Sequence, residues 1–324
     1  MHCAILASSN PYINLATEEY FLKTSDEEHF LIYINEPCIV VGKHQNLLSE
    51  INIPYVVKNK IKLARRISGG GTVYQDFNNL NFSFIHNCPN LDKISFENFT
   101  TPVLNALRKM GLNVQFSDRH DILIHEKKIS GNAMHVFRTR VLSHGTLLYN
   151  ADLKNLSNAL KNGPQKYHDK SIKSVRSSVT NIASYLTIPL TMEQFCQKLF
   201  ENIIDQLPMS YIRAISQEET DYIKILSSDK FESWDWIFGY SPKYIFQNSF
   251  DLLDRTVNFG LKIENGVIKS VTTDSQPTSI YKHAFELLNN TKHDYYHILE
   301  VLQNDKIITN TSSFNITEFC DLLF

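Results

Sequence analysis

Residues 65–76, Arg65-Arg66-Ile67-Ser68-Gly69-Gly70-Gly71-Thr72-Val73-Tyr74-Gln75-Asp76, decide how we interpret this chain. At average usage a chain of this length would hold roughly 23 glycines, and this one has 11, so three in succession are unusual. Glycine allows close approach of the main chain, and successive N–H groups can enclose an anion. The two arginines would add charge and paired donors. We expect an anion-binding turn, and a flexible hairpin tip with solvated arginines is the simpler alternative.

Apolar runs on both sides of this stretch predict that it connects two strands. Residues 56–64 lead into it, and residues 80–85 follow it as a buried strand. A Walker-type loop needs Gly-Lys-Ser/Thr before a helix, and a dinucleotide fingerprint needs Gly-x-Gly-x-x-Gly. The stretch has neither pattern, which argues against both kinds of nucleotide site.

Composition predicts a globular chain without a general affinity for nucleic acid or membranes. Its 324 residues are 43% hydrophobic and 20% charged, with a formal net charge of −2. The five cysteines are scattered without a Cys-x-x-Cys pair, which favours reduced thiols over a disulfide scaffold or a zinc site. We see no leader peptide and no run of about 18 apolar residues. We therefore expect a cytoplasmic protein.

Helical spacing of apolar residues predicts two helices in the first third of the chain. Residues 12–23 form an amphipathic pattern with Glu18 and Glu19 between the apolar positions. Residues 96–110 have the same period, and Gly111 is placed to end that helix.

Short apolar runs predict two pairs of strands. Residues 30–34 and 38–41 bracket Asn35-Glu36-Pro37, as in a hairpin. A second pair is expected at residues 136–142 and 144–148.

A change of pattern predicts two domains, residues 1–228 and 229–324. Residues 208–230 are polar and irregular, and the only two tryptophans follow them. Alternation on both sides of Asn265-Gly266 then predicts a hairpin. Helices at residues 280–288, 295–302 and 316–323 would complete a small α+β unit.

Three further segments could carry chemistry. Lys128, in Lys127-Lys128-Ile129-Ser130-Gly131-Asn132-Ala133, lies between strand-like runs, where it could meet a phosphate or a developing negative charge. His144-Gly145-Thr146 could supply a positioning imidazole, although a core or surface histidine is the simpler interpretation. Residues 173–180 form a basic, hydroxyl-rich loop that could close over a nucleotide or could be an ordinary surface loop.

Taken together, these motifs resemble the lipoate–protein ligase A family. The resemblance rests on Arg65–Gly71, Lys128–Ala133, His144–Leu148 and Ser174–Asn181, in that order. Weaker similarities lie at Asn14–Glu19 and Val41–Asn46, and Ser233–Gly239 is similar to the start of that family's accessory domain. The resemblance therefore covers nearly the whole chain.

The resemblance implies an α+β fold and a two-step reaction. The catalytic domain would be biotin/lipoate-ligase-like, with mixed β-sheets flanked by helices, followed by a small α+β C-terminal domain. ATP and lipoate would give lipoyl-AMP, with Mg²⁺ accompanying the phosphates. The lipoyl group would then pass to a lysine of a lipoyl domain in a 2-oxoacid dehydrogenase E2 subunit, or of the glycine-cleavage H protein.

The resemblance also implies the site residues. Lys128 would be catalytic and would bridge the acyl carbonyl and the α-phosphate. Asp121 would lie beside the adenylate, where it could hold Mg²⁺. The other residues implied to bind the substrate or adenylate are Arg66, Ser68, Gly69, Gly70, Gly71, Val73, Asn79, Ser130, His144, Gly145, Thr146, Lys173 and Arg176.

Two positions depart from the family pattern. Gln75 stands where histidine is common, which removes a titratable group. Lys43 stands where arginine is common, which keeps the charge but loses the planar fork of donors.

Other activities remain open on the residues alone. Acyl transferases of related fold use a cysteine nucleophile, and this chain has none between Cys88 and Cys196. A variant that accepts only preformed lipoyl-AMP, a non-catalytic nucleotide or acyl binder, and a biotin ligase are further alternatives.

Overall fold

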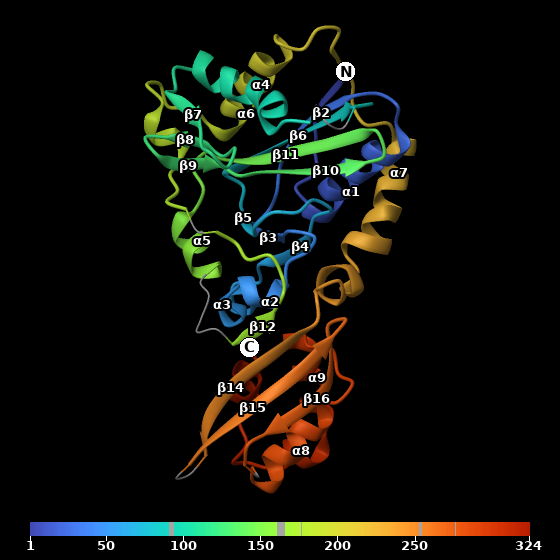
Figure 1. Cartoon of the computed structure of the whole chain (residues 1–324), viewed down its shortest axis with the longest axis vertical. Helices are drawn as coiled ribbons and strands as arrows, with labels where there is room; N and C mark the ends of the chain where they lie inside the picture. Colours follow the sequence, from blue (N-terminus) through green and yellow to red (C-terminus); the bar gives the residue numbers. More distant parts are fainter. Residues whose placement is uncertain (91–93, 161–165, 176, 253–254, 276) are drawn as a thin grey trace. The chain divides into compact units, whose positions relative to one another are not determined.

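The computed structural model describes residues 1–90, 94–160, 166–175, 177–252, 255–275 and 277–324 (Figure 1). The chain divides into two compact units. The first unit comprises Met1–Lys43, Lys62–Ser157 and Ser174–Ser233, and the second comprises His44–Ile61, Asn158–Lys173 and Trp234–Phe324. The second unit thus combines the C-terminal part of the chain with two earlier segments. The division into domains 1–228 and 229–324 stays a prediction.

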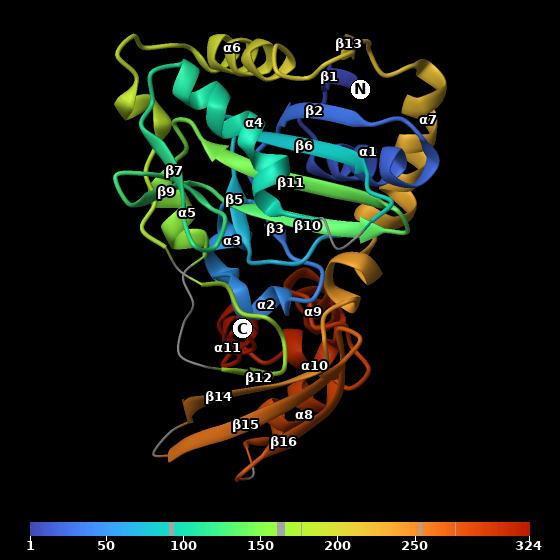
Figure 2. The ribbon, with the colours of Figure 1, turned by 45° about the horizontal axis from the view of Figure 1, so that its top comes forward.

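Six strands form the main sheet of the first unit, in the order β10-β11-β6-β2-β1-β13. Their bounds are β1 (His2–Ile5), β2 (His29–Ile34), β6 (Asn79–Asn87), β10 (Asn132–Phe137), β11 (Arg140–Leu148) and β13 (Tyr211–Ile212). Strand β1 is parallel to both of its neighbours, whereas the other pairs are antiparallel. The sheet is therefore mixed, and helices flank it (Figure 2), which confirms the predicted fold class.

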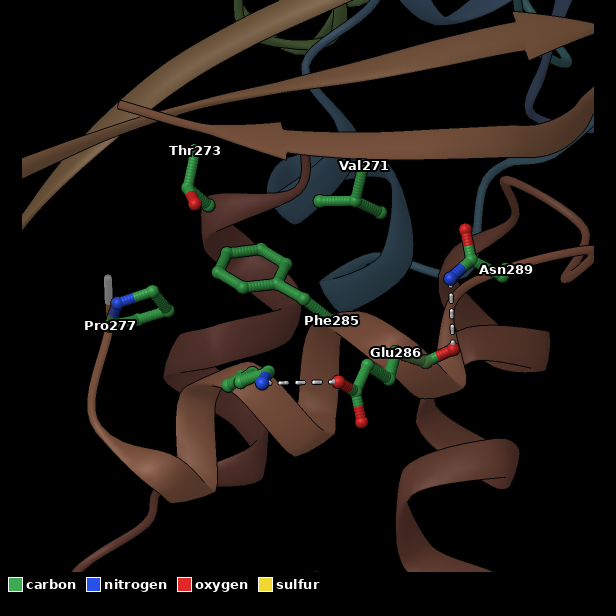
Figure 3. A pocket seen from close by; sticks show the side chains of 7 residues that line it. Val271, Thr273, Pro277, Phe285, Glu286 and Asn289 are labelled. Atoms are coloured by element: carbon green, nitrogen blue, oxygen red, sulfur yellow. Dashed lines mark hydrogen bonds and ion pairs between the residues drawn. The ribbon is translucent and has the colours of Figure 1, made fainter. Parts of the chain in front are cut away.

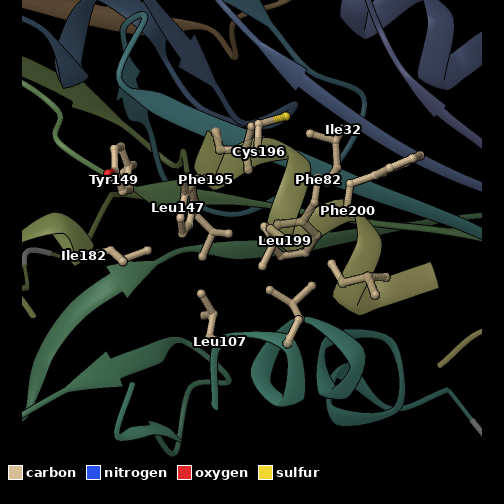
Figure 4. Packing of buried hydrophobic residues seen from close by; sticks show 14 of the residues in the cluster. Ile32, Phe82, Leu107, Leu147, Tyr149, Ile182, Phe195, Cys196, Leu199 and Phe200 are labelled. Carbon is tan, nitrogen blue, oxygen red and sulfur yellow. The ribbon is translucent and has the colours of Figure 1, made fainter. Parts of the chain in front are cut away.

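Helices cover both faces of the main sheet. Successive side chains of a strand point to opposite sides, so neighbouring residues of one strand pack on different faces. On one face, Leu107 of α4 (Phe96–Lys109) and Phe195 of α6 (Met192–Ile204) belong to the same buried cluster as Ile32 (Figure 4). On the other face, the neighbouring Tyr33 donates a hydrogen bond to Glu18 of α1 (Pro11–Thr24) at 2.9 Å. The predicted helices 12–23 and 96–110 are thus confirmed.

Two three-stranded sheets complete the first unit. One has the order β4-β3-β5 and the other β7-β8-β9. Their strands are β3 (Cys38–Val41), β4 (Lys62–Arg65), β5 (Val73–Gln75), β7 (Val114–Phe116), β8 (Ile122–Ile124) and β9 (Lys127–Ser130). The remaining helical segments here are η2 (Ile182–Tyr185), α7 (Gln217–Leu226) and η3 (Ser227–Phe231), and α5 (Leu153–Ala159) begins in this unit.

The predicted hairpin of residues 30–34 and 38–41 is wrong. Both segments are strands, but β2 pairs with β1 and β6, whereas β3 pairs with β4 and β5. All of β3 is buried, and so is all of β2 except its last residue. A strand buried on both faces lies inside a sheet and has a neighbour on each edge. Here those neighbours come from four different segments.

The predicted strand boundary near residue 143 is also wrong. The turn lies at Arg138-Thr139, between β10 and β11, and residues 140–142 belong to the second strand. Arg138 has a φ of +54°, the left-handed conformation that two-residue hairpin turns require. Neither residue of this turn is a glycine or an asparagine, so the usual sequence signal is missing.

The second unit contains an antiparallel sheet of order β12-β14-β15-β16. The predicted hairpin is confirmed, since Asn265 and Gly266 have φ values of +51° and +70°. A small pocket lies between Val271 of β16 and Phe285 of α8 (Figure 3). The elements of this unit are α2 (Leu47–Glu50), α3 (Ile53–Lys58), β12 (Tyr167–Asp169), η4 (Asp235–Gly239), β14 (Tyr244–Leu252), β15 (Arg255–Glu264), β16 (Val267–Thr273), α8 (Ser279–Leu287), α9 (Tyr295–Asn304), α10 (Lys306–Thr309) and α11 (Ile316–Leu322).

Within the described residues, no helix combines the length and the apolar character needed to cross a membrane.

Candidate active site

The glycine turn (residues 66–72) connects β4 to β5, the two strands on either side of β3. It closes over the residues that follow β3, since Lys43 N donates to the Ser68 carbonyl at 2.8 Å. A Cβ on Gly42 would lie 2.2 Å from the Gly70 carbonyl oxygen, so only glycine permits this approach. Gly70 itself has a φ of +85°. The turn is therefore packed against the end of β3.

Arg66 holds the glycine turn from inside. Its guanidinium donates to the carbonyls of Val40 (3.1 Å), Gly69 (2.6 Å) and Gly71 (2.7 Å). Its Nε atom also donates to the Ser68 hydroxyl at 3.0 Å. Burial lowers the pKa of Arg66 to about 10, so the side chain remains protonated at neutral pH. Its donors thus position the main chain of the turn.

A buried series of hydrogen bonds connects Ser68 to helix α1. Ser68 Oγ lies 2.6 Å from His144 Nε2, and His144 Nδ1 lies 2.8 Å from Glu18 Oε2. A carboxylate can only accept, so the Nδ1 atom of His144 carries a proton. The other oxygen of Glu18 accepts from Tyr33 at 2.9 Å, and burial raises the pKa of that phenol well above its usual value. These hydrogen bonds orient the imidazole of His144 toward the glycine turn.

Lys128 lies on β9 with its ammonium group held by a carboxylate. Its Nζ atom is 3.1 Å from Asp121 Oδ1, and the two side chains are 25% and 15% exposed. The Lys128 side chain crosses directly over Gly131, where a Cβ would lie 3.2 Å from Nζ. A cavity of about 230 Å³ is lined by this pair together with Ser117, Asp118, Arg119, Leu123, Glu126, Ser177 and Ser178.

The segment Ser174–Thr180 contacts both the glycine turn and Lys128. The N–H of Thr72 donates to Ser174 Oγ at 2.8 Å. Six residues further on, the Thr180 N–H donates to the Lys128 carbonyl at 3.0 Å, and the Lys128 N–H donates to the Ser178 carbonyl at 2.8 Å. The lysine and the glycine turn therefore each contact residues of the same stretch of chain, on either side of residue 176.

A family model described as the lipoyl protein ligase A/B catalytic domain matches residues 10–204. The chain belongs to the lipoyl protein ligase A/B family. Lipoate–protein ligase 1 of Staphylococcus aureus is 39% identical over 298 residues, covering 91% of this chain and 90% of that protein. The lipoate-protein ligase LplJ of Bacillus subtilis is 38% identical over 265 residues, covering 81% of this chain and 80% of its own. The resemblance seen in the sequence is confirmed.

Solved structures of ligases share the fold. A T. acidophilum protein with bound lipoic acid has a TM-score of 0.63 at 25% identity, covering 73% of this chain and 98% of its own. A bi-partite ligase from the same organism, described with its E2 lipoyl domain, also has a TM-score of 0.63 at 25% identity over 74% of this chain and 95% of its own. A lipoate-protein ligase A bound with ATP has a TM-score of 0.62 at 24% identity, covering 74% of this chain and 100% of its own.

Other residues implied by the family resemblance shape a corner between β9 and β10. The Thr146 N–H donates to the Gly131 carbonyl at 3.1 Å, and Ser130 Oγ donates to Asn132 Oδ1 at 3.3 Å. A Cβ on Gly145 would lie 2.2 Å from that same Asn132 oxygen. Ser130, Gly145 and Thr146 thus hold the connection at Gly131, over which the Lys128 side chain lies.

The remaining implied residues are more widely distributed. Val73 is half-buried at the start of β5, and Asn79 is buried at the start of β6. Lys173 belongs to the second unit, where its ammonium lies 3.0 Å from the Asp169 carboxylate and 2.9 Å from Ser49 Oγ. Arg176 lies outside the described residues. Every binding role in this set remains a prediction.

The sequence interpretation missed Glu18 and Tyr33. Glu18 and Glu19 were expected between the apolar positions of an amphipathic helix, yet both are buried, at 1% and 2% exposure. Glu19 meets Lys230 at 2.6 Å. A buried carboxylate needs a partner. The partners of Glu18 come from other segments of the chain, whereas Glu19 also meets Lys23 of the same helix at 2.5 Å. The sequence pattern that could have indicated a buried polar face is the pair Asn14 and Glu18, which lie on one side of the helix at i, i+4 spacing.

Proposed function

We propose that the cleft beside Lys128 joins lipoate to AMP and then to a protein lysine. The chain is an ATP-dependent lipoate–protein ligase, in keeping with its family and with the relatives above. The residue assignment rests on the position of Lys128. Its ammonium lies 3.1 Å from Asp121, and its strand is hydrogen-bonded to the same stretch of chain that contacts the glycine turn.

The chemistry requires two anions to be held together. A carboxylate is a poor electrophile at neutral pH, and a mixed anhydride with AMP gives it a good leaving group. No enzyme nucleophile is needed, so the work of the site is orientation and charge stabilisation. Lys128 would stabilise charge at the α-phosphate and then at the acyl carbonyl. Asp121 would keep the ammonium in place until the substrates arrive.

Mg²⁺ would accompany the phosphates, and Asp121 is the carboxylate that would hold it. Among the described residues, no group of three His, Cys, Asp or Glu side chains could bind a metal ion. Mg²⁺ commonly binds through one or two carboxylates together with substrate phosphates. The single carboxylate of Asp121 fits that mode, in which ATP completes the coordination.

The acceptors would be lipoyl domains of 2-oxoacid dehydrogenase E2 subunits and the glycine-cleavage H protein. Support for the first comes from the archaeal ligase described with its E2 lipoyl domain. We place the reaction in the cytoplasm, because the five scattered cysteines favour a reducing compartment.

The cysteine distribution counts against an acyl transferase with a thiol nucleophile. Burial raises the pKa of Cys3 and Cys196 to about 11, that of Cys320 to about 12 and that of Cys38 well above its usual value. Cys88 is half-buried just beyond the end of β6. It lies nine residues from Asn79, which is roughly 30 Å along an extended strand. It is therefore far from the start of β6.

Replacing the lysine tests the proposal. Lys128→Ala should fold normally and lose about 100-fold or more of its lipoate-dependent pyrophosphate release, the usual scale for one electrostatic group. Lys127→Ala is the matched control, because Lys127 is exposed on the same strand. Mass spectrometry of an acceptor domain incubated with enzyme, ATP, Mg²⁺ and lipoate gives the second readout. Full activity of Lys128→Ala would remove the proposed role, and transfer without pyrophosphate release would favour the transferase.

A further inference from the structure

Strand β16 forms one edge of the antiparallel sheet in the second unit, and only the first part of that edge is covered. The sheet order ends at β16. The Ile268 N–H donates to the Thr291 carbonyl at 2.9 Å, and the Ile268 carbonyl accepts from the Asn290 N–H at 2.8 Å. Beyond Ile268, no other segment among the described residues pairs with this edge. Residues 269–273 therefore leave the edge available to a further strand.

The pairing with β15 determines which main-chain groups face this open edge. The Asp274 N–H donates to the Asn258 carbonyl of β15 at 3.1 Å. Hydrogen-bonded and non-hydrogen-bonded pairs alternate along an antiparallel ladder. The main-chain groups of Thr273, and of Val271 two residues earlier, therefore point away from β15. Together these two residues present two N–H donors and two carbonyl acceptors along the edge.

The side chains of the same two residues line a cavity against helix α8. Val271 and Thr273 lie opposite Leu261 and Phe259, which are buried in the core of the unit. Residues opposite each other on neighbouring strands point to the same face, so Val271 and Thr273 face the helices. The cavity of about 210 Å³ separates them from Phe285 of α8 (Figure 3). The open edge and the cavity are thus formed by the same residues of β16.

The lining of the cavity favours an uncharged apolar group. Pro277 and Phe285 add apolar surface to that of the strand. Lys282 and Glu286 supply one charge of each sign, with Nζ and Oε1 3.9 Å apart and side chains that are 69% and 60% exposed. The side-chain nitrogen of Asn289 donates to the Glu286 carbonyl at 3.3 Å. The lining residues therefore carry no net charge, and their charged groups lie toward solvent.

We propose that the second unit binds an extended peptide segment of a partner protein, which adds to β16 as a further strand. One large apolar side chain of this segment enters the cavity beside Phe285. An extended chain is required because only a strand presents main-chain donors and acceptors at the spacing of Val271 and Thr273. A peptide residue opposite Val271 points its side chain toward α8, and its two neighbours point to the other face. The inference goes beyond the ligase reaction, since it uses no residue assigned to that reaction.

The length of the open edge favours a short peptide over a second copy of this chain. Ile268 is already paired, and the Asp274 N–H is directed to β15, so the described edge offers the main-chain groups of two residues. A stable interface between proteins buries about 1,200–2,000 Å² in total, far more than two paired residues provide. A short segment needs only these hydrogen bonds and one anchored side chain. This is the mode in which main-chain bonds give affinity and a pocket gives specificity.

Selection from a phage-displayed library of random heptapeptides on the full chain tests the inference. The selected sequences should share one apolar position, and a synthetic consensus peptide is then used for calorimetry. Thr273→Asp places a carboxylate in the cavity and should weaken peptide binding about tenfold or more. Thr272→Asp is the matched control, because Thr272 is exposed on the opposite face of the same strand, and binding should stay within about twofold. If no selected peptide distinguishes the two variants, the inference is wrong.

N-methylation of the consensus peptide separates strand addition from simple filling of the cavity. Methyl groups on the amides that face β16 should weaken binding about tenfold or more, and those on the intervening amides should change it by less than about twofold. Equal tolerance at all positions would show that a side chain binds without strand pairing, which would overturn the inference. Sedimentation of the protein without peptide gives the last readout. A dimer that Thr273→Asp dissociates would assign the edge to a second copy and would overturn it as well.

Discussion

The Nδ1 atom of His144 lies 2.8 Å from Oε2 of Glu18, a carboxylate that is almost completely buried. Hydrogen bonds to charged groups contribute more to stability than neutral ones, about 1.5–3 kcal/mol. This contact therefore helps to hold Ser68, and through it the glycine turn, against helix α1.

Replacing Glu18 by glutamine should destabilise the fold. Glu18→Gln keeps the shape of the side chain but removes the charge that both His144 and Tyr33 face. We expect the free energy of unfolding to fall by about 1–3 kcal/mol in urea denaturation. Glu201→Gln, at an exposed position of the same unit, should stay within about 0.5 kcal/mol of the wild type. Equal stability of the two variants would show that the buried contact contributes nothing.

The features that short motifs carry were predictable from the sequence. Glycines beside arginines predict a turn that could bind an anion, and Lys128 between strand-like runs predicts a lysine that could meet a phosphate. Both are local patterns. The structure adds that Arg66 donates to the Gly69 and Gly71 carbonyls of the turn and also to the Val40 carbonyl of the neighbouring strand β3.

Long-range polar contacts could not be predicted in the same way. The side chains of Asn35 and Gln75 meet at 2.6 Å although they are 40 residues apart. In the sequence Asn35 is part of Asn-Glu-Pro, a pattern typical of a turn. The same pattern favoured a hairpin, whereas the fully buried β3 pairs in another sheet. Partner choice between buried strands depends on the whole fold, which one strand's composition does not specify.

Two buried histidines should make stability depend on pH. His2 Nδ1 lies 3.0 Å from His29 Nδ1, and His2 Nε2 donates to the Arg213 carbonyl at 2.9 Å. His2 Nδ1 must then accept from His29, whose Nε2 lies 2.9 Å from Ser25 Oγ. Burial lowers the pKa of both rings, that of His29 to about 3, and the nearby charge of Arg140 adds to the effect on His29.

The sign of the pH effect follows from these lowered pKa values. The unfolded chain binds protons near pH 6.5 and the folded chain does not, so the stability contribution is complete above pH 6.5. It should be lost as the pH falls from 6.5 toward 3, by at most about 1.4 kcal/mol per pH unit for each histidine. Urea denaturation at pH 7, 6, 5 and 4 measures this slope. His29→Phe should flatten it, and an unchanged slope would exclude the pair as its source.

Alanine substitutions at Gly42 and Gly69 should affect the stability of the protein differently. A Cβ on Gly42 would lie 2.2 Å from the Gly70 carbonyl oxygen, a main-chain atom that cannot move without shifting the turn. Gly42→Ala should therefore lower the free energy of unfolding by about 1–3 kcal/mol, the usual cost of overpacking. Gly69→Ala is the control, because a Cβ there would meet nothing within 4 Å and the φ of Gly69 is not positive. Thermal and urea denaturation of both variants measure the difference. If Gly42→Ala were as stable as Gly69→Ala, the close approach of the turn to the end of β3 would be wrong.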